Sequence, residues 1–117
     1  CWGETPPHKP KGELMLQNSR TFKMSVTLYR ECLKVRLPNH LRDQMDRASS
    51  SISLNIAEGY GKSTYRDQRK FFHIAMGSLR EVQSVLILAE AESTLAYTHA
   101  DQLGGSLYRL IHAKPAP

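Results

Sequence analysis

The chain has 117 residues, of which 40% are hydrophobic and 23% are charged. This length suits one domain with a single core, and the composition is that of a globular protein, so two large domains and global disorder are excluded. No uncharged stretch approaches the roughly 20 apolar residues of a membrane span, and the first residues hold no apolar run typical of a secretory leader. The two cysteines, Cys1 and Cys32, do not make a disulfide framework. We therefore expect a cytoplasmic location and no membrane association.

The whole chain has a formal net charge of +5, and the positive charge is concentrated in its first two thirds. Residues 20–80 hold 12 basic and 5 acidic residues, whereas residues 81–117 hold 2 basic and 4 acidic ones. A basic region of this kind permits binding to nucleic acid or another polyanion. A solvated helix surface that serves solubility is an equally weighted alternative.

The first segment, residues 1–19, is predicted to be a flexible N-terminal arm. It has no hydrophobic period, and Pro6, Pro7, Pro10 and Gly12 interrupt any helix. We expect one helical domain over residues 20–114 and a short C-terminal tail over residues 115–117.

A first helix is predicted from about residue 21 to residue 35, and Pro38 ends this segment. Its apolar residues recur at helical spacing, at Phe22, Val26, Tyr29 and Leu33, and a second stripe beside them is formed by Leu28, Cys32 and Val35. A second helix is predicted from about residue 40 to residue 59, with Asn39 as its N-cap. Its stripe is formed by Leu41, Met45, Ala48, Ile52, Asn55 and Gly59. Gly59 and Gly61 are expected to supply the C-terminal stop and a tight turn.

The third helix has the clearest pattern and is predicted to begin after Thr64, whose side chain can cap it with Asp67 three residues later. We expect it to continue to about Glu92. One stripe is formed by Phe72, Ala75, Leu79, Val82, Leu86 and Ala89. An adjoining stripe is formed by Phe71, Ile74, Ser78, Val85 and Leu88.

A fourth helix is predicted from Thr98, as a cap, to about Lys114, and its apolar face includes Leu103 and Leu107. No segment shows the alternation of a half-buried strand. Four helices with short connections predict an all-α, antiparallel up-down four-helix bundle.

The second stripe of the third helix indicates self-association, because a helix of an isolated bundle needs only one apolar face. The residues predicted to form the interface between subunits are Phe71, Ile74, Val85 and Leu88. The alternative is a single wide face that lies wholly inside one bundle.

Two segments are distinctive: RASSSISLNIAEGYGK over residues 47–62 and FFHIAMGSLREV over residues 71–82. Together they resemble the motifs of the bacterial four helix bundle protein family, also called the 23S rRNA intervening-sequence protein family. The resemblance covers roughly residues 20–113. Met76 departs from it, because the family often has a basic residue before the glycine, which puts any basic contact at this position in doubt.

The resemblance implies an up-down four-helix bundle that assembles as a ring-like homopentamer, without established catalytic activity and without a cofactor. Some members are encoded inside insertions in 23S rRNA genes. A related branch serves as an accessory protein to the reverse transcriptase of diversity-generating retroelements, where it is basic and binds nucleic acid.

The polar residues of the motif need partners if they are buried. For Glu58 the expected partner is Arg47, Arg69 or Arg80. We favour a structural role, in helix register or a subunit contact, over contact with a ligand or nucleic acid. The same structural role is expected for the rest of the motif, which comprises Asn55, Gly59, Gly61, Gly77, Ser78 and Glu81; Gly77 and Ser78 are expected to let another helix approach closely.

Enzymatic chemistry has little support in the sequence. The five histidines are scattered and none has metal-site spacing, so we predict no metal site and no catalytic residues. The stretch from Gly59 to Ser63 lacks the first glycine of a phosphate-binding loop. A small-ligand or enzymatic role around Asn55 and Glu58 is therefore the weakest of three hypotheses.

The leading hypothesis is a non-catalytic, oligomeric scaffold that binds RNA or DNA, with or without a protein partner. Tyr60 and Tyr65 lie among the basic residues and can stack on bases. The second hypothesis is a protein-interaction module with no role in nucleic-acid binding. The residues predicted to contact nucleic acid are Arg42, Arg47, Lys62, Arg66, Arg69 and Lys70.

Overall fold

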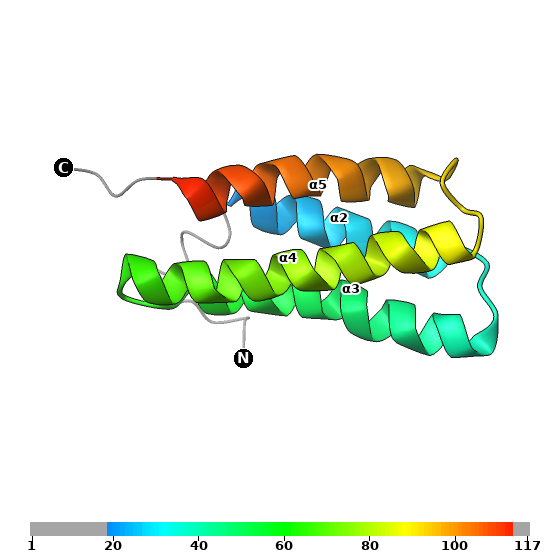
Figure 1. Ribbon diagram of the computed structural model, residues 1–117, viewed down its shortest axis with the longest axis horizontal. Coiled ribbons are helices and arrows are strands. Elements are labelled where there is room, and N and C mark those ends of the chain that lie inside the picture. Colours follow the sequence, from blue (N-terminus) through cyan, green and yellow to red (C-terminus); the bar gives the residue numbers. More distant parts are fainter. Residues whose placement is uncertain (1–18, 114–117) are drawn as a thin grey trace, which may run out of the picture.

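The computed structural model describes residues 19–113, which form four helices and no strand. The helices are α2 (Arg20–Lys34), α3 (Asn39–Tyr60), α4 (Tyr65–Leu88) and α5 (Leu95–His112). Successive helices run in opposite directions (Figure 1). The predicted up-down four-helix bundle is confirmed. Except for Ser19, the predicted N-terminal arm lies outside the described residues, as does the predicted tail.

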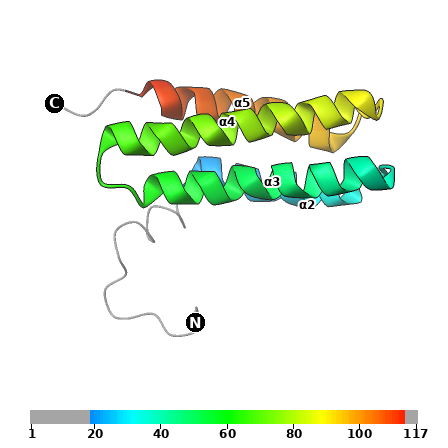
Figure 2. The ribbon, with the colours of Figure 1, turned by 60° about the horizontal axis from the view of Figure 1, so that its bottom comes forward.

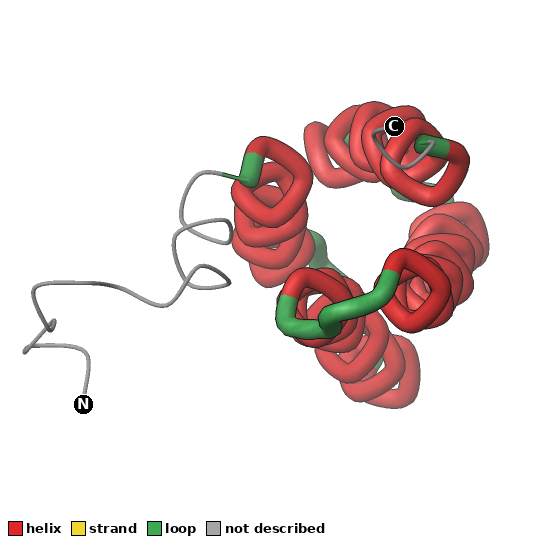
Figure 3. The backbone as a smooth tube through the Cα atoms, turned by 90° about the vertical axis from the view of Figure 1, so that its left-hand side faces the viewer, coloured by secondary structure: helices red, strands yellow, loops and turns green. Residues whose placement is uncertain are grey.

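The four helices surround one central core, as the end-on view shows (Figure 3). Each helix packs against two neighbours, in the order α2, α3, α4, α5 and back to α2, and α3 and α4 make the most extensive contact. The turn between α3 and α4 lies at one end of the bundle, opposite the other two connections (Figure 2). Within residues 19–113, no helix has the length and apolar character needed to cross a membrane.

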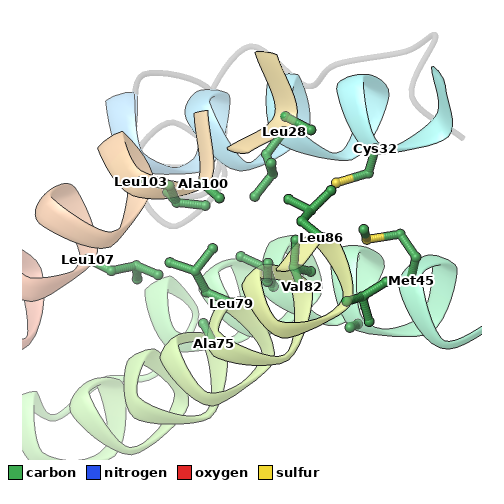
Figure 4. Close-up of a cluster of buried hydrophobic side chains, with 14 of the residues drawn as sticks. Leu28, Cys32, Met45, Ala75, Leu79, Val82, Leu86, Ala100, Leu103 and Leu107 are labelled. Carbon is green, nitrogen blue, oxygen red and sulfur yellow. The ribbon is translucent and has the colours of Figure 1, made fainter. Parts of the chain in front are cut away.

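The core is built from the predicted stripes of α3, α4 and α5, whereas α2 turns Leu28 and Cys32 inward and leaves Leu33 of its first predicted stripe 50% exposed. Leu28, Ile52 and Leu79 are completely buried, and each buried leucine or isoleucine stabilises the fold by about 1.5 to 3 kcal/mol relative to an exposed one. Figure 4 shows residues of all four helices pointing toward one another. Cys32 belongs to this cluster, and burial raises the pKa of its thiol to about 12, so the thiol stays neutral.

Three side-chain oxygens cap the helices. The backbone N–H of Phe22 donates to Ser19 Oγ at 3.0 Å, and that of Asp67 donates to Thr64 Oγ1 at 3.1 Å. The predicted cap at Thr64 is therefore correct. For α5 the cap is Thr94, so the prediction of Thr98 was wrong by one helical turn.

The early start of α5 follows from an early end of α4, which stops at Leu88 and not near Glu92. Glu90 has a φ of 56°, in the left-handed region. The N–H of Ala91 donates to the carbonyl of Leu86 at 2.8 Å, and that of Glu90 donates to Ile87 at 3.0 Å. This is a Schellman motif, with glutamate where glycine is usual. The sequence does not indicate this helix end, because the left-handed position is occupied by Glu90 and not by glycine.

Two predictions at the ends of α3 were also wrong. Asn39 is the first helical residue, and Pro38 occupies the N-cap position without a side-chain hydrogen bond. Gly59 lies inside the helix and does not end it. Gly61 follows the helix with a φ of −79°, so the turn needs no left-handed residue there.

Pairs of hydroxyl groups connect three of the four neighbouring helix pairs. Because a buried hydroxyl group without a partner is costly, each pair favours one register of the two helices. The pairs are Thr21 with Ser106 at 2.7 Å, Ser25 with Ser53 at 2.9 Å and Ser51 with Ser78 at 2.9 Å.

Gly59 allows α4 to pack closely on α3. A Cβ atom at this position would lie 2.5 Å from a ring carbon of Phe72, and Phe72 is itself only 3% exposed. The aromatic ring of Phe72 therefore rests on the backbone of α3. This contact is possible only because residue 59 is glycine and has no Cβ atom. At Gly77, by contrast, an added Cβ would meet no atom within 4 Å. The predicted close approach at Gly77 is therefore not made within one subunit.

These two glycines give a matched prediction. Gly59→Ala should lower the free energy of unfolding by about 1 to 3 kcal/mol, because overpacking at Phe72 exceeds the gain in helix propensity. Gly77→Ala should raise it by up to about 1 kcal/mol, since alanine is the better helix former. Urea unfolding followed by circular dichroism measures both. Equal effects of the two substitutions would contradict the packing of Phe72 on Gly59.

Candidate functional site

Four of the six predicted nucleic-acid contacts come together at the end of the bundle that holds the α3–α4 turn. Lys62 lies in the turn, and Arg66, Arg69 and Lys70 lie on the first two turns of α4. The last three are exposed and Lys62 is half-buried. We call these four residues the basic cluster. Because α4 begins here, the positive end of its dipole adds to their charge.

Lys62 is the most constrained member of the basic cluster. Its Nζ lies 3.2 Å from Glu58 Oε2 and 5.1 Å from the centroid of the Phe71 ring. Glu58 therefore pairs with Lys62, and the predicted arginine partners were wrong. The reason is local, because Lys62 follows Glu58 by one helical turn. An exposed ion pair of this kind contributes at most about 1 kcal/mol.

The other cations of the basic cluster are freer. The guanidinium of Arg69 lies 5.6 Å from the centroid of the Tyr65 ring. Arg66 and Lys70 make no ion pair with any described residue. Both side chains can therefore meet a phosphate without first breaking an ion pair within residues 19–113.

Arg42 lies at the opposite end of the bundle and has a structural role. Its guanidinium donates to the carbonyl of Cys32 at 2.8 and 3.2 Å and to that of Val35 at 3.3 Å. It also lies 3.6 Å from Asp46. These bonds satisfy carbonyl groups at the C-terminal end of α2, where the Cys32 carbonyl also accepts from the Val35 N–H at 3.3 Å. The structure therefore separates Arg42 from the basic cluster.

Arg47 is exposed on α3 and stands apart as well. It precedes Lys62 by 15 residues, which at the rise of an α-helix is about 22 Å. The six predicted contacts therefore divide into one cluster of four, one structural arginine and one isolated arginine.

Three polar residues of the family motif, Ser51, Ser78 and Glu81, lie along the contact between α3 and α4. The amide of Asn55 donates to the carbonyl of Ser51 at 2.8 Å and to its hydroxyl at 3.0 Å. Ser51 also pairs with Ser78. The side chain of Gln44 donates to Glu81 across the two helices. The motif therefore includes cross-helix pairs that align α3 with α4.

The four residues predicted for a subunit interface do not share one face. Ile74 and Leu88 are 43% and 70% exposed, and Phe71 is half-buried. Val85 is only 3% exposed and belongs to the core of the bundle. It is therefore not available for contact with another subunit, because it lies one helical turn after the completely buried Val82 and shares its face.

A small pocket of about 130 Å³ lies beside the basic cluster. Gln68 and Leu110, which were not predicted as site residues, help to form it. The i to i+3 spacing from Tyr65 to Gln68 could have indicated the first, whereas Leu110 comes from α5 and no local pattern places it here. The pocket is lined by Tyr60, Tyr65, Gln68, Arg69, Phe72 and Leu110.

Within residues 19–113, no three His, Cys, Asp or Glu side chains are grouped so that they could hold a metal ion.

The fold and the helix-aligning motif define the chain as a small all-α bundle protein. It belongs to the 23S rRNA-intervening sequence protein family, whose family model matches residues 14–112. The predicted family is confirmed. No curated protein and no solved structure matches the chain.

The contrast between the two outlying arginines can be tested. Arg42→Met should lower the free energy of unfolding by about 1 to 3 kcal/mol, because it removes hydrogen bonds from a charged donor. Arg47→Met, on the exposed face of the same helix, should change it by less than about 0.5 kcal/mol. Urea unfolding measures both. If Arg42→Met were as stable as Arg47→Met, the structural role of Arg42 would be wrong.

Proposed function

We propose that this protein is a non-catalytic helical scaffold that binds RNA or DNA through phosphate contacts at the basic cluster. The observation that carries the proposal is the gathering of four cations and two tyrosines, Tyr60 and Tyr65, at one end of the bundle. Cations neutralise phosphates and release counterions, which supplies most of the affinity in binding that does not depend on sequence. Aromatic rings beside them offer stacking surfaces for bases.

A second candidate function is a protein-interaction module, and a different surface favours it. An apolar hollow of about 210 Å³ lies between α2 and α3. Val26, Tyr29 and Leu54 line it, and Leu54 is 67% exposed. An exposed apolar hollow of this kind is a feature of protein-binding surfaces. Its position away from the basic cluster allows the two functions to be tested separately.

Self-assembly is the other part of the proposal. Ile74 and Leu88 expose apolar surface on α4, and most soluble oligomers are symmetric assemblies of one chain. A ring would repeat the basic cluster once per subunit, and such repetition strengthens weak contacts by raising the effective concentration of sites. The family resemblance favours five subunits.

Binding of nucleic acid should depend steeply on salt. For a labelled single-stranded oligonucleotide, the logarithm of the binding constant should fall by about 0.7 per phosphate contact for each tenfold increase in salt. The double substitution Arg66→Gln with Lys70→Gln should weaken binding and reduce that slope by about 1.4. Fluorescence anisotropy at several salt concentrations measures both quantities.

The matched control removes two exposed arginines from α2 and from the connection that follows it, Arg30→Gln with Arg36→Gln. It changes the net charge equally and should leave the affinity close to that of the unmodified protein. Equal weakening by the two double substitutions would favour diffuse charge over a defined site. No salt-sensitive affinity for any RNA or DNA would overturn the proposed function and leave the interaction module as the alternative.

Size-exclusion chromatography with light scattering tests self-assembly. A pentamer of a 13.3 kDa chain has a mass of about 66 kDa. Leu88→Lys should dissociate the assembly because it places a charge on the exposed apolar surface of α4. Leu33→Lys, at an exposed leucine on α2 that does not line the apolar hollow, should not. A clean monomer of the unmodified protein at micromolar concentration would contradict self-assembly.

A further inference from the structure

The pocket beside the basic cluster shares only Arg69 with the phosphate contacts proposed above. It lies between the C-terminal end of α3, the start of α4 and the final turns of α5. We infer that this pocket receives one base of a single-stranded nucleic acid. The inference rests on the proposed function and deepens it, because it assigns the ligand chemistry to a defined place.

The wall of the pocket is held in position before any ligand arrives. The rings of Tyr60 and Phe72 meet edge to face, with centroids 5.4 Å apart and planes at 65°. The Tyr60 hydroxyl accepts a hydrogen bond from Ser19 Oγ at 2.8 Å. Phe72 in turn rests on the backbone at Gly59. A rigid aromatic wall binds more tightly because less side-chain freedom is lost on binding.

The size of the pocket suits a single aromatic ring. Its volume is about 130 Å³, and an apolar cavity of about 150 Å³ in another protein holds benzene. A pyrimidine base, or the six-membered part of a purine, has these dimensions. Leu110 and Phe72 supply apolar surface, and Tyr65 supplies a third aromatic ring at the start of α4.

Polar groups in the pocket match a base with an attached phosphate. The Gln68 amide nitrogen donates to the carbonyl of Lys62 at 3.1 Å. Its amide oxygen makes no hydrogen bond with a described residue and can accept from an N–H on the edge of a base. Arg69 lines the same pocket, and Arg66 and Lys70 lie on the same two turns of α4 for the flanking phosphates.

This combination favours a single strand over a duplex. A base in a duplex is stacked and paired, so its faces are not free to enter a pocket. Unstacked bases of single strands bind to aromatic side chains next to a positively charged groove. An acidic peptide would match the cations, but it would bring a planar ring only where it contains an aromatic residue, whereas every nucleotide carries one.

The inference is tested on the unmodified protein with two labelled strands of equal charge: an oligonucleotide of twelve thymidines and the same strand in which every base is absent. Stacking of one base is expected to make the first strand bind about 5- to 150-fold more tightly than the second. Fluorescence anisotropy gives both dissociation constants, and an oligouridine strand repeats the measurement for RNA.

Substitutions show which side chain causes the preference for the strand that carries bases. Tyr65→Ala should abolish most of the preference for the strand that carries bases, and Tyr65→Phe should retain it because the ring remains. Tyr108→Ala is the matched control: Tyr108 lies exposed on α5, outside the pocket, against His112. It should bind both strands as the unmodified protein does. Circular dichroism confirms that each variant is folded.

The outcomes separate this inference from the proposed function. Equal, salt-sensitive affinity for the two strands would overturn base binding and leave the phosphate contacts standing. No affinity for either strand, together with no change in the NMR signals of the Leu110 methyl groups on addition of uridine monophosphate, would overturn both. A change in those signals without affinity for either strand would show that a base enters the pocket. It would overturn the proposed scaffold and, with it, the binding of a single strand.

Discussion

The contact between Phe72 and Gly59 is the constraint on which the rest of the structure depends. The ring occupies the space that a Cβ atom would take, so α4 lies directly against α3, and these two helices make the most extensive contact in the bundle. Three consequences follow. The motif pairs can span the two helices, as Ser51 and Ser78 do. The position of Phe72 fixes its edge-to-face contact with the ring of Tyr60. The short turn that carries Lys62 is held at one end of the bundle.

The helical period was predictable from local spacing, whereas two local features, the Glu58–Lys62 ion pair and the end of α4, were missed together with contacts between distant segments. The spacing of Leu79 and its stripe placed the core correctly, because burial follows the helical period. Thr64 was recognised as a cap because its partner is three residues away. The end of α4 was missed because Glu90 takes a left-handed conformation usually occupied by glycine, an arrangement with a cost of about 1 to 3 kcal/mol that tertiary packing must offset.

The same distinction explains the candidate site. The basic cluster was predicted because its members lie within nine consecutive residues, from Lys62 to Lys70. The separation of Arg42 from the basic cluster was not predictable, because its guanidinium binds the carbonyl groups of Cys32 and Val35, whose positions are known only once α2 has packed on α3. Leu110 was missed because it belongs to another helix. Composition and local spacing therefore identify charges, and the fold decides which of them are free to bind a ligand.

The close packing of α3 and α4 builds the end of the molecule that we propose binds nucleic acid. The most direct test is an NMR titration of the isotope-labelled protein with a single-stranded oligonucleotide, following every backbone amide. The account predicts that the signals that shift are concentrated in residues 58–73 and around Leu110, while residues 36–47 at the opposite end stay unchanged. Shifts centred on residues 36–47, or spread evenly over all four helices, would contradict it.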